Sequence, residues 1–485
     1  MSLNPLLGGG DPAVRDVGHL LYRGLLKLDD RTAYPRPDLA TSYTFSADGL
    51  TLSAVLPSTL RWSDGHPLTT TDVVATLAFA QSQRAANHSL TAQLHGVTVS
   101  VNNGSITFHL PAPRASFAAT LAQLPILPLG GLSAGRLASV AAQSDAPLAT
   151  SGPFQVQSAD VNAVSLTRNA FAQHPPRLAS FQLRLYSGFS DVLNAYKGGQ
   201  VDGALALTPA QRTQLLAVKG STSHDIATFR FVDLLFNERT PGLDDTVVRH
   251  ALSTAVNRAR IVDGALERVG GLPQVDAVPL GVQWAARPDL EAASPDAAAT
   301  ALEGAGWIFG PAGVREKHGV VLAFTIAVPD ADPLPTVAKE LATQLAVVGA
   351  NVYVDVVPAL TYVNTTLVPH NFQLALADWD AGPDPDVSSF WRSNAVPPQG
   401  FNVSEGPVDP FLDQALDSLA TLVDPQARIT AAQSVSRYLA DDAPAAFLYT
   451  PRVSYVMRVA MSSAPVPAVG GSETRFDDVA SWRRA

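Results

Sequence analysis

The sequence predicts an α/β protein with more than one domain. Strand and helix patterns alternate after residue 180, as in proteins built from α/β units. The clearest unit covers residues 320–358, where an apolar strand (VVLAFTIAV), a helix (PTVAKELATQLAVVG) and a second strand (ANVYVDVVP) follow one another. The chain has 485 residues, 46% of them hydrophobic. That length predicts about three domains or two large lobes.

Composition excludes several classes of function. The net charge of −10 argues against nucleic acid and against anionic membrane surfaces as partners. No run of eighteen apolar residues occurs, so we expect no membrane span. The absence of cysteine excludes thiolate catalysis, cysteine-ligated zinc and disulfides. The ten histidines are scattered, and no phosphate-binding glycine motif follows a strand. We therefore expect no catalytic residues, no metal and no cofactor.

The N-terminal region combines a glycine run with an apolar helix pattern. Residues 14–28 have leucines and valines at helical spacing, with Gly24 as a break. Before them, Gly8, Gly9 and Gly10 could let the backbone approach a ligand closely, or form a flexible leader. The start of the chain has no basic segment followed by an apolar one, so it is not a signal peptide. Residues 1–3 are interpreted as a remnant that replaces an export segment.

A hairpin and a capped helix come next. Residues 43–62 predict two strands around a turn at residues 46–49. In the stretch LRWSDGHPLTTTDVVATLAFAQ, Asp64 and Gly65 predict another turn. Thr70 or Thr71 would then cap a helix, with Asp72 in its first turn.

The acidic stretch from Phe372 to Trp391 is the main candidate site. Its alternating apolar residues predict a strand, and Gly382 and two prolines end regular structure after it. Four carboxylates and two indoles gather where the strand ends, which suits a cationic group through charge-assisted hydrogen bonds and cation–π attraction. The alternative is a solvated acidic turn. These residues are Asp378, Trp379, Asp380, Asp384, Asp386 and Trp391.

Several blocks resemble, in the same order, those of the family 5 solute-binding receptors of peptide-type ABC importers. The most specific is WSDGHPLTTTDV at residues 62–73, which in that family forms a turn and a helix cap. The acidic block ADWDAGPDPD at residues 377–386 resembles the family's acidic loop. The other blocks are residues 18–28, 37–40, 148–154, 191–207, 234–262 and 302–307.

The resemblance implies a two-lobed, periplasmic-binding-protein-like fold of class II, of the large peptide-receptor type, in which the ligand is trapped between the lobes. The expected lobe I comprises residues 1–40, 149–237 and 458–485, with an inserted subdomain at 41–148. Lobe II would be residues 238–457.

The resemblance also implies function. We expect a monomeric, non-enzymatic receptor in the periplasm or at the outer face of the cytoplasmic membrane, where a lipid anchor is one means of attachment. It would deliver a small peptide-like ligand to ABC permease subunits and their ATPase. Asp380 matches the family's acidic residue for the ligand's amino group, with Asp378 and Asp384 as substitutes. The expected ligand-binding set is Asp378, Trp379, Asp380, Asp384, Trp391, Asn402, Gly8, Gly9 and Gly10.

Three alternatives remain open. Aromatic side chains also stack on sugar rings, so an oligosaccharide ligand is possible, and nickel complexes occur as ligands in the same family. A serine hydrolase is the third, because residues 131–135 (GLSAG) match the nucleophile-elbow pattern around Ser133. That pattern requires a buried strand before it, and Pro125 and Pro128 disfavour one there. We therefore expect Ser133 to be a helix cap or a loop residue.

Overall fold

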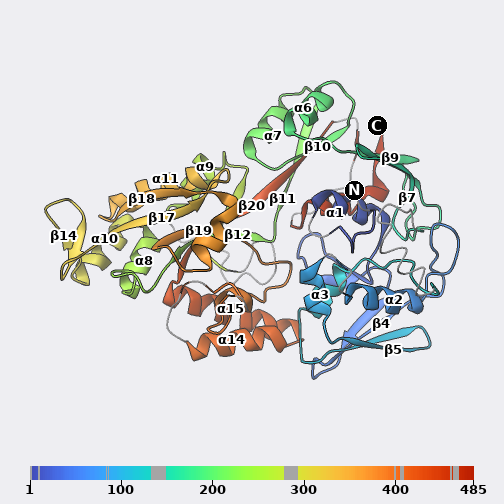
Figure 1. The fold of residues 1–485 in the computed structure, drawn as a ribbon, viewed down its shortest axis with the longest axis horizontal. Coiled ribbons are helices and arrows are strands. Elements are labelled where there is room, and N and C mark those ends of the chain that lie inside the picture. The colour runs from blue at the N-terminus through green and yellow to red at the C-terminus, as the bar shows by residue number, and fades with distance from the viewer. Residues whose placement is uncertain are drawn as a thin grey trace. The chain divides into compact units, whose positions relative to one another are not determined.

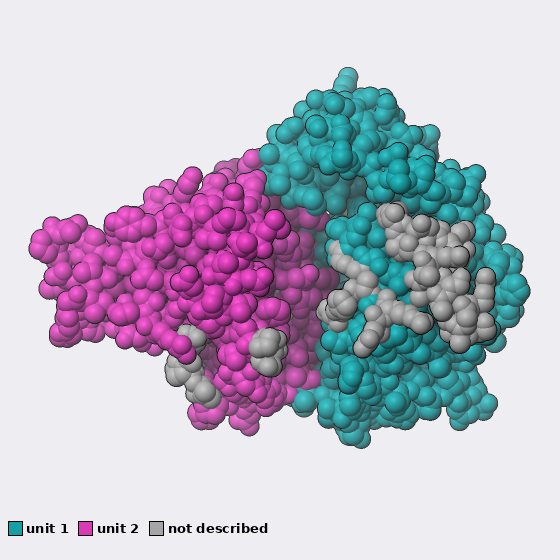
Figure 2. All heavy atoms as spheres, in the orientation of Figure 1, with its two compact units in different colours: residues 1–226, 421–423, 454–485 teal, residues 227–420, 424–453 magenta. Residues whose placement is uncertain are grey.

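The computed structural model describes residues 3–8, 11–82, 85, 87–132, 149–277, 293–397, 400–402, 404, 409–458, 461–462 and 469–484. The described residues form a mixture of helices and strands, which confirms the predicted α/β class. They separate into two compact units (Figure 2). Unit 1 comprises residues 1–226, 421–423 and 454–485, and unit 2 comprises residues 227–420 and 424–453. The lobe and subdomain bounds expected from the sequence stay a prediction.

The described residues of unit 1 form four small antiparallel sheets, one of them the pair of short strands near the C-terminus, and six short α-helices (Figure 1). A two-stranded sheet is formed by β1 (Leu26–Leu28) and β2 (Pro35–Pro37). A four-stranded sheet has the order β3 (Ser42–Phe45), β4 (Thr51–Val55), β6 (Ser105–His109) and β5 (Thr98–Asn102). A three-stranded sheet has the order β7 (Phe154–Ala159), β8 (Ala163–Arg168) and β9 (Ser180–Arg184). The α-helices are α1 (Pro12–Leu21), α2 (Thr70–Ala80), α3 (His88–Leu94), α4 (Phe117–Ala122), α6 (Phe189–Lys197) and α7 (Pro209–Leu216).

The C-terminal part of the chain completes unit 1. The strand β10 (Gly203–Ala206) pairs with the last residues of β20 (Ala445–Arg458), a strand that begins in unit 2 and ends in unit 1. The remaining elements are β11 (Ser221–Ala227), β21 (Met461–Ser462), β22 (Arg483–Arg484) and two 3-10 helices, η2 (Ser472–Phe476) and η3 (Val479–Ser481). Aromatic side chains from this part, including Tyr455, Phe476 and Trp482, join the unit's main hydrophobic core.

The helix expected over residues 14–28 is only partly correct. Helix α1 ends at Leu21, and residues 26–28 form a strand instead. The Leu21 carbonyl accepts hydrogen bonds from the backbone N–H groups of Ser151 and Gly152, at 3.1 and 2.8 Å. The Ser151 hydroxyl in turn accepts the Arg23 N–H. The Leu21 carbonyl and the Arg23 N–H, which a longer helix would have paired internally, therefore form hydrogen bonds with a distant segment of the chain.

The predicted hairpin and capped helix are present. Strands β3 and β4 pair antiparallel, and helix α2 follows, with its N-cap at Thr69 rather than at Thr70 or Thr71. Asp72 completes a capping box with Thr69. Its carboxylate also accepts hydrogen bonds from the Trp62 indole, at 3.3 Å, and from the Gly130 N–H, at 2.9 Å. The motif around residues 62–73 is therefore structural.

Unit 2 is built on one sheet with helices packed against it (Figure 1). Strand β12 (Arg230–Phe236) lies between β19 (Leu374–Asp380) and the first residues of β20, antiparallel to both. Strand β17 (Ala323–Pro329) pairs parallel with β19 and with β18 (Asn351–Val357). Helix α11 (Leu334–Val347) connects β17 to β18 and packs into the core, which confirms the unit predicted at residues 320–358.

The other elements of unit 2 are short strands and helices. The strands are β13 (Gly271–Pro273), β14 (Ile308–Phe309), β15 (Arg315–Lys317) and β16 (Val320–Val321). The helices are α8 (Thr246–Ala255), α9 (Arg258–Gly264), α10 (Pro295–Gly304), α12 (Ala359–Tyr362), the π-helix η1 (Val363–Leu367), α13 (Ser388–Trp391), α14 (Pro410–Thr421) and α15 (Pro425–Asp442). Among the described residues, no helix combines the length and the apolar character that crossing a bilayer requires.

Candidate functional site

The acidic stretch lies where β19 ends. Strands β12 and β19 pair over seven residues each, and the register sets Arg230 opposite Asp380 and Phe231 opposite Trp379. The strand ends at Asp380, and Gly382 follows with a φ of +70°, a left-handed conformation that glycine adopts without steric cost. Side chains alternate along a strand, so Asp378 and Asp380 share one face of β19 while Trp379 lies on the other.

Asp378 is neutralised by an arginine from the neighbouring strand. Its carboxylate makes a bidentate ion pair with Arg230, with N···O distances of 2.9 and 2.6 Å. The Asp378 side chain is 21% exposed, and burial raises its pKa above the ordinary value. The Arg230 guanidinium opposes that rise in pKa, whereas the charge of Asp380 adds to it. The charge of Asp378 is therefore already balanced within the protein, by the Arg230 guanidinium.

Asp380 has no such partner. The side chain is exposed, and its Oδ1 accepts the Gly382 N–H at 3.1 Å. Within the described part of the chain, no cation pairs with Asp380 and nothing donates to its Oδ2. Asp378, Arg230 and Asp380 thus carry two negative charges and one positive charge at one strand end. The cluster has an excess of one negative charge, which one ligand cation would balance.

The other two carboxylates hold the loop after the strand. Asp384 makes a bidentate ion pair with Arg428 on α15, at 3.0 and 2.6 Å, and the two side chains are 14% and 7% exposed, respectively. Asp386 accepts hydrogen bonds from the backbone and hydroxyl of Ser388, at 3.0 and 2.5 Å. Burial raises the pKa of Asp386. The carboxylates of Asp384 and Asp386 thus hold the backbone between β19 and α13 in place.

Trp379 belongs to an aromatic cluster on the opposite face of β19. Its ring centroid lies 5.3 Å from that of Phe390 and 5.9 Å from that of Phe401. Phe390 also meets Phe231 edge-on at 5.7 Å. Phe401 is 49% exposed, so the cluster reaches the surface of unit 2. An apolar aromatic surface therefore lies behind the acidic strand end.

The Trp379 indole nitrogen donates a hydrogen bond to Oδ1 of Asp233, at 3.2 Å. Asp233 is fully buried in β12, and its Oδ2 has no hydrogen-bond partner among the described residues. Burial holds the pKa of Asp233 well above its usual range. Asp233 was not among the residues predicted from the sequence, although a carboxylate inside the apolar run FVDLLF is a signal that could have indicated it.

Trp391 and Asn402 lie in the segment that follows the acidic loop. Trp391 is 4% exposed and meets Phe447 edge-on at 5.6 Å, and its indole nitrogen has no hydrogen-bond partner in the described ranges. The Asn402 amide nitrogen donates to the Arg392 carbonyl at 3.0 Å, and its oxygen accepts from Ser404. Both side chains contact their own unit, and their role toward a ligand stays a prediction.

The glycine run lies in unit 1. Gly8 packs directly against helix α1, because a β-carbon placed on it would lie 2.2 Å from Cγ1 of Val14. Gly9 and Gly10 lie outside the described residues, and so does Ser133 of the alternative hydrolase motif. The residues that the structure describes contain no group of His, Asp or Glu side chains arranged to hold a metal ion.

Comparisons with known proteins agree with this architecture. Residues 34–400 match the family model described as "Bacterial extracellular solute-binding proteins, family 5 Middle". Protein XP55 of Streptomyces lividans is 25% identical over 471 residues, which cover 92% of this chain and 81% of the relative. The match to the family model confirms the resemblance found in the sequence.

Two solved structures show the shared fold. The unliganded open form of MppA, a periplasmic murein tripeptide binding protein, has a TM-score of 0.84 at 18% identity and covers 100% of this chain and 95% of its own. The nickel ABC transporter protein of Bacillus halodurans has a TM-score of 0.81 at 19% identity and covers 97% of this chain and 96% of its own. These two similarities support the two-lobed fold class expected from the sequence.

Proposed function

Because the chain belongs to the bacterial extracellular solute-binding proteins of family 5, we propose that it captures a small solute with a free amine and passes it to the membrane subunits of an ABC importer. Peptides are the first class of candidate solute, and the structural relative MppA is named for binding a murein tripeptide. The chain would act as a receptor and carry out no reaction on the solute.

The observation that carries the proposal is the unbalanced charge at the end of β19. Arg230 satisfies Asp378, and Arg428 satisfies Asp384. Of the three carboxylates predicted to bind the ligand's amine, only that of Asp380 is exposed and has no ion-pair partner among the described residues. A ligand ammonium would find there a charge-assisted acceptor worth roughly 1.5–3 kcal/mol. Asp380 is therefore a better candidate for the amine than its two substitutes.

The aromatic cluster suits the apolar part of such a solute. Trp379 and Phe401 lie next to the acidic strand end, and Phe401 is half exposed. Aromatic rings bury large apolar areas and accept aliphatic or aromatic side chains without demanding one sequence. A receptor that fixes an amine and tolerates varied side chains would accept several short peptides.

Mass spectrometry of the small molecules that copurify with the protein tests this proposal. The released material should gain the mass of an acetyl group when it is treated with an amine-acetylating reagent. A released sugar, or any solute without a primary amine, would contradict the proposal and favour the oligosaccharide alternative. A bound nickel complex would favour the metal alternative.

A further inference from the structure

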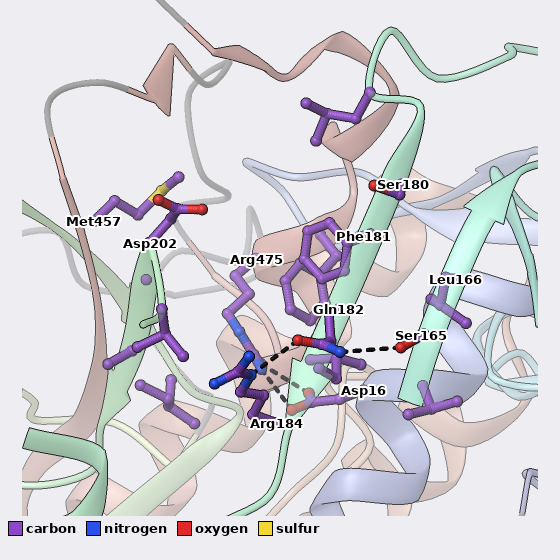
Figure 3. Close-up of a pocket in the computed structure, with 18 of the residues that line it drawn as sticks. Asp16, Ser165, Leu166, Ser180, Phe181, Gln182, Arg184, Asp202, Met457 and Arg475 are labelled. Atoms are coloured by element: carbon purple, nitrogen blue, oxygen red, sulfur yellow. Dashed lines mark hydrogen bonds and ion pairs between the residues drawn. The ribbon is translucent and has the colours of Figure 1, made fainter. Parts of the chain in front are cut away.

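A small cavity in unit 1 is lined by charged side chains of both signs. It has a volume of about 340 Å³ and lies among strand β1, the loops at residues 151–153 and 172–177, and the segment at residues 477–481. It shares no lining residue with the larger cavity of about 710 Å³ that Figure 3 shows, where Phe181 of β9 and Met457 of β20 lie on opposite sides. Ligand pockets in proteins usually measure about 300–1,000 Å³, so the smaller cavity suits a ligand of few heavy atoms.

Two of the charged groups that line this cavity are already paired within the protein. The Arg23 guanidinium lies 2.7 Å from the carboxylate of Asp38, and the Asp477 carboxylate lies 2.5 Å from Nε2 of His19. Burial opposes the charged form of His19, but the Asp477 carboxylate holds the pKa of His19 above its ordinary value. Arg23 and Asp477 therefore need no ligand to balance their charges.

Lys27 and Asp478 line the same cavity without a partner. Both residues are half-buried, and neither side chain has an ion-pair or hydrogen-bond partner among the described residues. Burial and the charge of Arg23 lower the pKa of Lys27, whereas burial and the charge of Asp477 raise the pKa of Asp478. No ion pair joins Lys27 to Asp478, although the Lys27 charge opposes the rise in the pKa of Asp478. Both groups are thus disfavoured in their charged forms, and a counter-charge from a ligand would stabilise each of them.

Arg177 supplies a second unpaired cation at the rim. Its backbone N–H donates to the Ala480 carbonyl at 3.0 Å, which holds the loop of Arg177 beside the segment that carries Asp478. The Arg177 side chain is exposed, and in the described ranges its guanidinium has no partner. Lys27, Arg177 and Asp478 together carry two positive charges and one negative charge, so the unpaired side chains have an excess of one positive charge.

We propose that this cavity binds a free α-amino acid, with its carboxylate at Lys27 and its ammonium at Asp478, and prefers one with an acidic side chain. An α-amino acid carries both charges on neighbouring atoms, so it can form charge-assisted hydrogen bonds with two groups that do not pair with each other. A simple anion would leave Asp478 unpaired, and a simple amine would leave Lys27 unpaired. A second carboxylate would face Arg177 and give the ligand a net charge of −1, which balances the excess positive charge of the unpaired side chains.

Calorimetry of the full chain with three small ligands tests the proposal. L-glutamate should bind, and N-acetyl-L-glutamate, which lacks the ammonium, should bind at least about tenfold more weakly. L-alanine lacks only the second carboxylate and should bind about two- to fivefold more weakly than L-glutamate, as expected for the loss of an exposed ion pair. Because the proposed solute site also takes amines, the titrations are repeated with Asp380→Asn, which should leave all three affinities unchanged. A loss of L-glutamate binding in Asp380→Asn would overturn the assignment to this cavity without affecting the proposed function.

Variants of the cavity assign each charge. Asp478→Asn and Lys27→Gln should each weaken L-glutamate at least about tenfold, whereas the matched control Lys219→Gln, at an exposed site of unit 1 outside the cavity, should change nothing. Arg177→Gln should remove the difference between L-glutamate and L-alanine and leave L-alanine binding as it is.

The ligand series on the parent protein keeps the proposal falsifiable if a cavity variant does not fold. Equal affinities for L-glutamate and N-acetyl-L-glutamate would overturn the proposal, because Asp478 would then have no ammonium to bind. No measurable binding of L-glutamate would also overturn it, as would L-glutamate binding that folded Asp478→Asn and Lys27→Gln proteins retain in full.

Discussion

The indole nitrogen of Trp379 donates a hydrogen bond across 3.2 Å to Asp233, a fully buried carboxyl whose second oxygen has no partner among the described residues. This contact ties the aromatic surface behind the acidic strand end to a titratable group inside the sheet. It therefore links the pH response of unit 2 to the neighbourhood of the proposed solute site.

Asp233→Asn should make unit 2 less sensitive to pH. Burial raises the folded-state pKa of Asp233, whereas an unfolded Asp titrates near about 3.9. The folded parent therefore loses stability as pH rises from the unfolded pKa towards the folded pKa. Asparagine does not titrate and can still accept the Trp379 hydrogen bond. The stability advantage of the variant should grow as pH rises above the unfolded pKa of about 3.9, as measured by urea unfolding across a pH series.

A matched control for this variant is Asp355→Asn, which removes an exposed charge from β18 of the same unit. Parallel pH–stability curves for the parent and Asp233→Asn would mean that Asp233 does not titrate as its burial requires.

Glu238 should give a second pH response, which ends near neutrality. Its Oε2 lies 3.1 Å from Arg249, and its Oε1 has no partner among the described residues. Burial and the charge of Asp442 raise the pKa of Glu238 to about 7. Stability should therefore fall as pH rises from the unfolded pKa of about 4.3 to the folded pKa of about 7 and level off above it, with a slope of at most about 1.4 kcal/mol per pH unit for one proton. Glu238→Gln should flatten this part of the curve, and an unchanged slope would contradict the assignment.

Asp384→Asn should lower stability without altering amine recognition. The variant removes the bidentate partner of Arg428, and breaking a buried ion pair from one side costs about 3–5 kcal/mol. The double variant Asp384→Leu/Arg428→Met should recover much of that loss, because it leaves no buried charge. Denaturant unfolding measures both effects. A stable Asp384→Asn protein with weakened amine binding would instead assign Asp384 to the ligand.

Gly8→Ala should destabilise unit 1, because the added methyl group would meet Cγ1 of Val14 at 2.2 Å. Overpacking of this kind costs typically about 1–3 kcal/mol. Truncating the neighbour in a Gly8→Ala/Val14→Ala protein should relieve the clash, so the two substitutions should couple in a double-mutant cycle. Simple additivity in thermal unfolding would show that Gly8 is not packed against the helix.

Local patterns in the sequence predicted the local structure well. The capping residues around Asp72 and the apolar periods of residues 320–358 specify a helix start and a strand–helix–strand unit, because both depend on neighbours in the chain. The end of helix α1 was not predictable in the same way. It depends on hydrogen bonds from Ser151 and Gly152, which lie far away in the sequence.

The candidate site shows the same limit. The sequence indicated the acidic cluster but could not tell which carboxylates have partners inside the protein. The arginines that neutralise Asp378 and Asp384 come from residues 230 and 428, and no spacing rule connects them to the loop. Side chains alternate along a strand, so Trp379 and Asp380 lie on opposite faces of β19, which the expectation of an indole beside the amine-binding carboxylate did not take into account.

Calorimetry on Asp380→Asn tests the central claim most directly, with a free-amine ligand and its N-acetylated form measured against the parent and the control Asp355→Asn. The amide keeps the shape of the side chain and removes its charge. The variant should bind the amine about 10- to 100-fold more weakly, equivalent to about 1.5–3 kcal/mol, and the acetylated form almost unchanged. Asp355→Asn should bind both ligands as the parent does. Equal losses for the two ligands, or no loss for either, would contradict the assignment of Asp380 to the solute's amino group.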